Sequence, residues 1–243
     1  MWEISISCNS KFKSHLYFIS SALDTYKDVK IYKAVSTKNG LTTLSLATKK
    51  EDRLLIDFLK DKIADAIIFI EKEEYIKKHS KFKLVSSTCK SAFKKALVLF
   101  DFEEDKEYTL RKLSLDKNIN LHAFFQFRLQ QLKKKWAELV LITNQENSLL
   151  GGADVLLGFL IESIKPTDRK VFVDTKNKNY VLLNEAGEII RERYISENIS
   201  DEVDLVTNLI VLSPLRINIL CKNNITSETY NLLNCIFSGR VKP

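Results

Sequence analysis

The chain is poor in the residues that build most enzyme and metal sites. Its 243 residues include only three histidines, four cysteines and six glycines. The cysteines lie far apart and form no C-x-x-C pair, which argues against a zinc site and a disulfide framework. The glycines form no phosphate-binding loop of the G-x-x-x-x-G-K-[ST] or G-x-G-x-x-G type, and no G-x-S-x-G elbow. We therefore expect no catalytic residues, no metal and no cofactor.

Long apolar runs and a signal sequence are also missing. Unbroken apolar stretches such as Ala66 to Ile70 are far shorter than the roughly 20 residues that a membrane-spanning helix needs. The N-terminal M-W-E-I-S-I-S lacks the basic and apolar regions of a signal peptide. We expect a cytoplasmic protein with no membrane span, whose cysteines are reduced and buried.

What the chain has in excess is positive charge, and this charge is concentrated near the N-terminus. Residues 1–100 contain 19 basic and 11 acidic residues, a balance of +8, against +7 for the whole chain. No acidic residue lies between Lys77 and Phe100, so the lysines of this stretch can form one anion-attracting surface. They can equally be a solvated helical face neutralised by the acidic cluster at Asp101 to Asp105. The lysines are Lys77, Lys78, Lys81, Lys83, Lys90, Lys94 and Lys95.

A second basic group, Lys133, Lys134 and Lys135, lies in a predicted helix and is expected to point away from its apolar stripe. With the first group, Lys133 and Lys134 complete the candidate set for binding an anion or a nucleic acid. Few aromatic residues are interleaved with these lysines, so base stacking receives little support.

Hydrophobic periodicity predicts an α+β fold in three consecutive segments, which can pack as one or two structural domains. Residues 1–80 form a β-α-β-β-α unit, with a hairpin at Asn39-Gly40 and helix caps at Ser10 and Thr48. Residues 81–165 form a helical middle with no strand. Residues 166–243 form a β-meander followed by an α-β-α unit.

The run from Asn118 to Trp136 is the most distinctive stretch of the chain. It predicts one helix from Leu121 to Thr143, whose apolar stripe makes it the hydrophobic axis of the fold. Arg128 lies at the edge of this stripe, and we expect it to hold the helix to a neighbouring element through a carboxylate or carbonyl partner. The stripe consists of Leu121, Phe125, Leu129, Leu132, Trp136 and Leu139.

Four blocks of the sequence, in the same order, resemble the YtxC-like sporulation proteins of endospore-forming bacteria. The first is N-I-N-L-x-x-F-x-x-F-R-L-x-x-L, and the others span residues 180–190, 204–219 and 235–241. The resemblance implies a sporulation setting and no particular reaction. Many members carry a cysteine-rich tail beyond the last glycine that this sequence lacks, so no metal or redox role is carried over.

These observations favour a cytoplasmic, non-enzymatic, sporulation-associated protein that acts through contacts with a protein partner. The alternative is a nucleic-acid-binding module that uses the two lysine groups. A third hypothesis is an enzyme whose site is assembled from residues distant in sequence.

Overall fold

The protein has an α+β fold, seen here in a computed structural model that describes residues 1–81, 86–149, 153–190 and 199–242. It divides into two compact units, each with its own four-stranded sheet. The first unit contains Met1–Tyr75 and Phe102–Leu139, and the second contains Ile76–Asp101 and Val140–Pro243. The predicted helical middle contributes to both units, so the spatial division does not follow the three consecutive segments.

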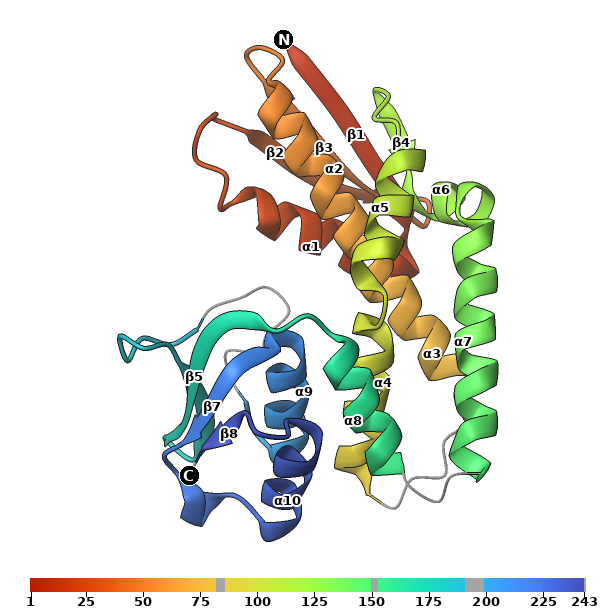
Figure 1. Cartoon of the computed structure of the whole chain (residues 1–243). Coiled ribbons are helices and arrows are strands. Elements are labelled where there is room, and N and C mark those ends of the chain that lie inside the picture. Colours follow the sequence, from red (N-terminus) through yellow and green to blue (C-terminus); the bar gives the residue numbers. More distant parts are fainter. Residues whose placement is uncertain (82–85, 150–152, 191–198, 243) are drawn as a thin grey trace. The chain divides into compact units, whose positions relative to one another are not determined.

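The sheet of the first unit has the strand order β2-β3-β1-β4 (Figure 1). Its strands are β1 (Trp2–Asn9), β2 (Tyr32–Lys38), β3 (Leu41–Thr48) and β4 (Asn118–Asn120). The hairpin between β2 and β3 is confirmed, since Asn39 and Gly40 have the positive φ angles, 51° and 74°, that a two-residue turn requires. Strand β4, which pairs in parallel with β1, is a correction: three residues are too short to show a strand period.

Two predicted helix caps are also corrected. Helix α1 (Ser14–Leu23) follows a short 3-10 turn, η1 (Ser10–Phe12), in which the side chain of Asn9, not Ser10, accepts a backbone hydrogen bond. Helix α2 (Arg53–Ile67) is capped by Asp52, which accepts from the Leu55 amide at 2.8 Å. Thr48 is the buried last residue of β3, and its hydroxyl donates to the carbonyl of Lys50 instead.

The core of the first unit contains most of the predicted apolar stripe. Leu121, Phe125, Leu129, Leu132 and Trp136 are all buried there, with α1 packed on β1 and β3, and α2 packed on α1. The predicted single helix is, however, broken at Leu129 into α6 (Leu121–Arg128) and α7 (Gln130–Leu149). No glycine or proline marks the break, so the sequence pattern could not reveal it.

The remaining helical segments of the first unit either continue α2 along the chain or begin at the acidic cluster. Helix α2 continues into a π-helical turn, η2 (Ile68–Lys72), and then into α3 (Glu73–His79). Helix α5 (Phe102–Lys112) carries the acidic cluster in its first turn, where carboxylates favour the helix dipole. Helices α3 and α7 each begin in the first unit and end in the second.

The sheet of the second unit has the strand order β6-β5-β7-β8, and β5, β7 and β8 run parallel. Its strands are β5 (Thr167–Lys176), β6 (Asn179–Leu183), β7 (Pro214–Ile219) and β8 (Val241–Lys242). The β5–β6 hairpin is confirmed, but β7 and β8 extend the sheet beyond a simple meander. Of the predicted third meander strand, Glu188–Tyr194, Ile189 makes an isolated bridge to Leu183 and residues 191–194 lie outside the described ranges.

The helices of the second unit cover one face of this sheet. Helices α9 (Glu202–Leu212) and α10 (Ser227–Ile236) lie against it (Figure 1), α4 (Ser87–Leu99) packs on α9, and α8 (Ala153–Ser163) packs on α10. In the described residues of both units, no helix is both long enough and apolar enough to cross a bilayer.

Candidate functional site

The described lysines of the first basic group lie in the second unit, on or just after α3 and on α4. Lys77 and Lys78 are exposed in the last turn of α3, Lys81 is exposed just after it, and Lys90, Lys94 and Lys95 project from α4. Lys83 lies outside the described residues. The gap from Lys90 to Lys94 is one helical turn, so these two side chains share a face of α4.

Two of these lysines, Lys77 and Lys90, are within electrostatic reach of a third, Lys94. Burial, and then the ammonium groups of Lys90 and Lys77, lower the pKa of Lys94. Like charges that repel in this way mark a locally concentrated positive potential, which attracts anions. We name Lys77, Lys90 and Lys94 the lysine triad.

The second basic group lies in the first unit, and its three members have different surroundings. The ammonium group of Lys133 lies 4.7 Å from the centre of the Phe125 ring and donates to Gln126. Burial lowers the pKa of Lys133, whereas Glu71 acts to raise it. Lys135 does not point away from the apolar stripe, because it donates to Glu104 at 3.1 Å and to Asp105 at 3.0 Å. Lys134 is exposed.

Among the described residues, Arg128 lacks the carboxylate or carbonyl partner that the sequence indicated. Its side chain is exposed at the end of α6, and within the described parts of the chain no carboxylate or carbonyl binds it. The helix breaks immediately after it, which turns the expected edge of the apolar stripe toward solvent. Its neighbour Phe127 is exposed as well, at 79%.

The strongest polar constellation of the first unit was not visible in the sequence. Lys72, the last residue of η2, lies 2.8 Å from Asp105 of α5, and both side chains are almost completely buried. The indole N–H of Trp136 donates to the same carboxylate oxygen of Asp105 at 2.9 Å. A buried carboxylate with this many donors ties η2, α5 and α7 together.

A second set of ion pairs joins α2 to α5. Lys106 lies 2.6 Å from Asp61 and 2.7 Å from Asp65, and Lys62 also contacts both carboxylates. Burial alone would lower the pKa of Lys106, but its hydrogen bonds to the two aspartates raise the pKa overall. Lys106 therefore stays charged and links the two helices.

A cysteine, a histidine and a glutamate approach one another near α1. His15 Nε2 lies 3.3 Å from Glu71, and His15 Nδ1 lies 2.9 Å from the carbonyl oxygen of Phe12. The thiol of Cys8 donates to the same carbonyl at 3.3 Å. Burial, and then Glu71, raise the pKa of Cys8 to about 11. The sulfur is therefore a neutral thiol, the opposite of an activated nucleophile.

The polar centre of the second unit is Glu202, in the first turn of α9. It accepts from the amide and the hydroxyl of Thr226, at 2.7 and 2.5 Å, and from the hydroxyl of Thr229. Burial acts to raise the pKa of Glu202, but these hydrogen bonds lower it overall. Tyr180 donates to the carbonyl of Asn224 at 2.5 Å, and burial, followed by Glu202, raises its pKa to about 12. The cluster fixes the starts of α9 and α10 against β6.

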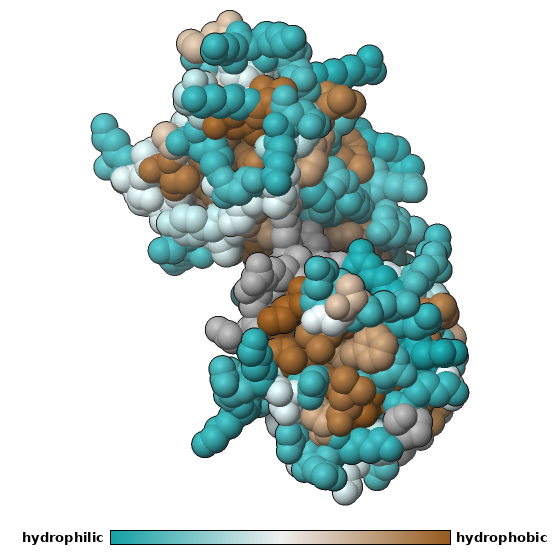
Figure 2. Space-filling model, turned by 90° about the vertical axis from the view of Figure 1, so that its left-hand side faces the viewer, coloured by the Kyte–Doolittle hydropathy of each residue, from teal (hydrophilic) through white to brown (hydrophobic). Residues whose placement is uncertain are grey.

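The opposite face of the same sheet carries hydrophobic side chains that its helices do not cover. Strand alternation and register place these side chains on one face, where they range from half-buried to 59% exposed at Leu220. Figure 2 shows hydrophobic patches ringed by hydrophilic side chains on the second unit. We name this surface the C-terminal sheet face. Its apolar residues are Phe172, Val181, Leu183, Ile189 and Leu220.

An open hollow of about 700 Å³ adjoins this face, lined by Phe172 and Leu220 together with polar groups of the β7–α10 connection. Asp174 and Asn218 border it from the strands, and Lys222 and Asn224 from the connection. The face thus combines apolar side chains with polar ones, because Asn218 pairs in register with Phe172 and Asp174 pairs with Val181. Such a mixture is found in protein contact surfaces.

Comparisons with protein families, with curated proteins and with solved structures find no match to this chain. The side chains that the structure describes also form no group of three or more His, Cys, Asp or Glu residues placed to hold a metal ion. Function must therefore be inferred from the surfaces themselves.

Proposed function

We propose that the protein is non-catalytic and acts by binding another protein through the C-terminal sheet face. The observation that carries the proposal is the group of apolar side chains on a sheet face that α9 and α10 leave open. Clustered exposed apolar side chains with a polar rim mark contact sites, whereas isolated ones do not. The sporulation setting rests on the four sequence blocks alone.

The chemistry of the buried reactive groups supports a non-catalytic role. The thiols of Cys8 and Cys221 have raised pKa values, chiefly because both are buried, and the raised pKa of Tyr180 keeps its phenol neutral. The carboxylate of Glu202 already accepts hydrogen bonds from Thr226 and Thr229. These groups are used to hold the fold.

The test is affinity capture with the full chain and two matched variants. Leu220→Lys places a charge in the C-terminal sheet face, and Leu54→Lys places one on α2, where Leu54 is 70% exposed. A partner retained by the wild-type chain and by Leu54→Lys, but lost with Leu220→Lys, supports the proposal. Equal retention by all three chains would contradict it.

The non-catalytic part has a separate test. Turnover of a substrate by the purified chain, abolished by changing one polar residue that lines a pocket, would refute it.

A second candidate function, nucleic-acid binding, is favoured by one observation, the positive potential that Lys77 and Lys90 create at Lys94. Binding through the lysine triad should weaken steeply with salt, and a footprint of six or more phosphates would lose about a thousandfold in affinity between about 50 and 200 mM salt. Changing Lys77, Lys90 and Lys94 to Gln should lower the salt slope by about one per lysine, whereas Lys11→Gln should not. Undetectable binding to RNA and DNA at about 50 mM salt would exclude this function.

A further inference from the structure

Strand β2 is the free edge of the first sheet. Among the described residues it pairs with β3 alone, and every side chain of β2 except Lys33 is exposed. Figure 1 shows it at the outer edge of the sheet. The unpaired amide and carbonyl groups of a seven-residue edge strand are a template for another strand.

The hairpin geometry determines which backbone groups point outward. A two-residue turn closes on a hydrogen-bonded pair, here Lys38 with Leu41, and such pairs alternate along an antiparallel ladder. Every second residue of β2 therefore directs its N–H and C=O away from β3. These residues are Lys33, Val35 and Thr37, and Val35 is the central residue of the strand.

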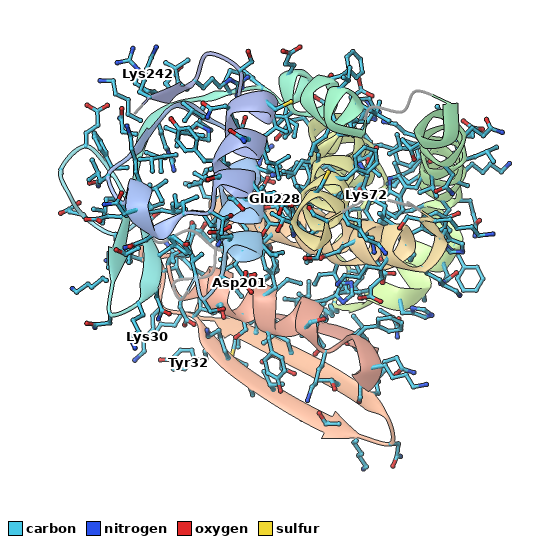
Figure 3. The ribbon with its side chains drawn as sticks, turned by 90° about the horizontal axis from the view of Figure 1, so that it is seen from below. Lys30, Tyr32, Lys72, Asp201, Glu228 and Lys242 are labelled. Atoms are coloured by element: carbon cyan, nitrogen blue, oxygen red, sulfur yellow. The ribbon has the colours of Figure 1, made fainter. Side chains whose placement is uncertain are left out.

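Lysines commonly protect an edge strand, and two of the lysines at this edge, Lys30 and Lys33, make contacts within the unit. The ammonium group of Lys33 donates to the carbonyl of Ser20 at 2.9 Å and lies 2.5 Å from Asp24, so its charge is neutralised within the unit. Lys30, just before β2, lies with its ammonium group 5.1 Å from the centre of the Tyr32 ring (Figure 3).

We propose that a second copy of this chain pairs with β2, antiparallel, about a two-fold axis at Val35. This register matches the outward-pointing groups and gives about six backbone hydrogen bonds across the axis. It also joins the first sheet of one copy and the first sheet of the other into one continuous sheet.

The strand is self-complementary in this register. Val35 faces its own copy and buries a side chain that is 43% exposed in the single chain. Lys33 faces Thr37, and Tyr32 faces Lys38, an arrangement that allows a cation–π contact. No two like charges lie directly opposite, so the main obstacle to edge pairing is absent from this register.

The experiment is sedimentation of the purified full chain from low-micromolar to near-millimolar concentration. Because one strand pair makes a small interface, we expect reversible dimers with a dissociation constant in the micromolar range. Val35→Lys and Val35→Glu each place like charges across the axis, and should weaken dimerisation roughly tenfold or more. Val35→Thr keeps a β-branched side chain and should still dimerise.

Mixing the two charged variants gives the decisive result. An equimolar mixture of Val35→Lys and Val35→Glu should form heterodimers, because opposite charges then meet at the axis. A wild-type chain that stays monomeric would overturn the proposal, and would leave β2 open to a strand from another protein. Dimers that persist in either charged variant alone, or that fail to return in the mixture, would also overturn it.

Discussion

The two sheets differ most on the faces that their helices leave open. The open face of the first sheet carries small, mainly hydroxyl side chains along its middle, paired in register across β2, β3 and β1, and its large exposed hydrophobic residues, Tyr32 and Leu41, lie at opposite ends of the strands. The C-terminal sheet face carries Phe172, Leu183 and Leu220 in comparable positions. Apolar side chains are held out of water only if something covers them, and this is why we propose the second face as the contact surface. The small side chains of the first face are Ser5, Ser7, Ala34, Ser36, Thr43, Ser45 and Ala47.

The units also differ in how they bury charge. The first unit buries an ion pair, formed by Lys72 and Asp105, that has almost no contact with water. The second unit uses a carboxylate, Glu202, that is satisfied by neutral hydroxyl and amide donors. Removing one member of a buried ion pair leaves the other charge buried without a partner. Removing a hydrogen-bonded carboxylate instead leaves neutral groups that water can reach. The two units should therefore respond very differently to loss of their central carboxylate.

The largest effect is expected for Asp105→Ala. It removes the partner of the buried Lys72 ammonium and the acceptor of the Trp136 N–H, so the free energy of unfolding should fall by about 3–5 kcal/mol. Urea denaturation followed by tryptophan fluorescence measures it. Glu104→Ala, at a 75% exposed carboxylate, should stay within about 0.5 kcal/mol. Equal losses in the two variants would show that the buried pair does not hold the first unit together.

A smaller effect is expected for Glu202→Gln, about 1–2 kcal/mol at neutral pH, because weaker acceptors replace the carboxylate. The lowered pKa of Glu202 means that its ionised form is favoured in the folded state. That stabilisation is present above the ordinary glutamate pKa, 4.5, and is lost as the pH falls through the folded value. The difference between wild type and Glu202→Gln should therefore shrink below about pH 4.5. A pH-independent difference would contradict this assignment.

Tyr180→Phe should cost about 1 kcal/mol, the net value of a buried hydroxyl hydrogen bond. Because the pKa of Tyr180 is raised from 10.0 to about 12, its contribution is present below pH 10.0 and is lost as the pH rises through about 12. As the pH rises between these limits, the wild-type chain should therefore lose more stability than the variant, and thermal unfolding at each pH measures the difference. If both chains lose stability in parallel, the phenol is not part of the polar centre of the second unit.

The smallest effect is expected for Arg128→Lys. An exposed guanidinium with no described partner should change stability by less than about 0.5 kcal/mol. The same urea titration measures it, and a loss comparable to that of Asp105→Ala would restore the structural role that the sequence suggested.

What the sequence could predict depended on short-range chemistry. The turn at Asn39-Gly40 and the stripe containing Phe125 and Trp136 were predictable, because turn residues and helical periodicity act over a few positions. The α+β class follows from the same local signals. Strand β4 and the break at Leu129 have no such signal, since one is too short for a period and the other contains no helix-breaking residue.

The candidate sites were less predictable, because their members meet from distant parts of the chain. Lys72 and Asp105 are 33 residues apart, and Lys135 reaches Asp105 from 30 residues away. A run of lysines therefore could not show which ammonium groups are engaged internally. The C-terminal sheet face combines β5, β6 and β7, and its parallel β5–β7 pairing was not evident from periodicity.

The contrast between the two open faces has one direct test. A photoreactive amino acid is placed at Leu220 on the C-terminal sheet face, or at Ser45 on the open face of the first sheet, and the cells that make the protein are irradiated. We expect Leu220 to crosslink to a specific protein and Ser45 to give none. Equal crosslinking from both positions, or a specific partner at Ser45 alone, would contradict the assignment of the C-terminal sheet face as the contact surface.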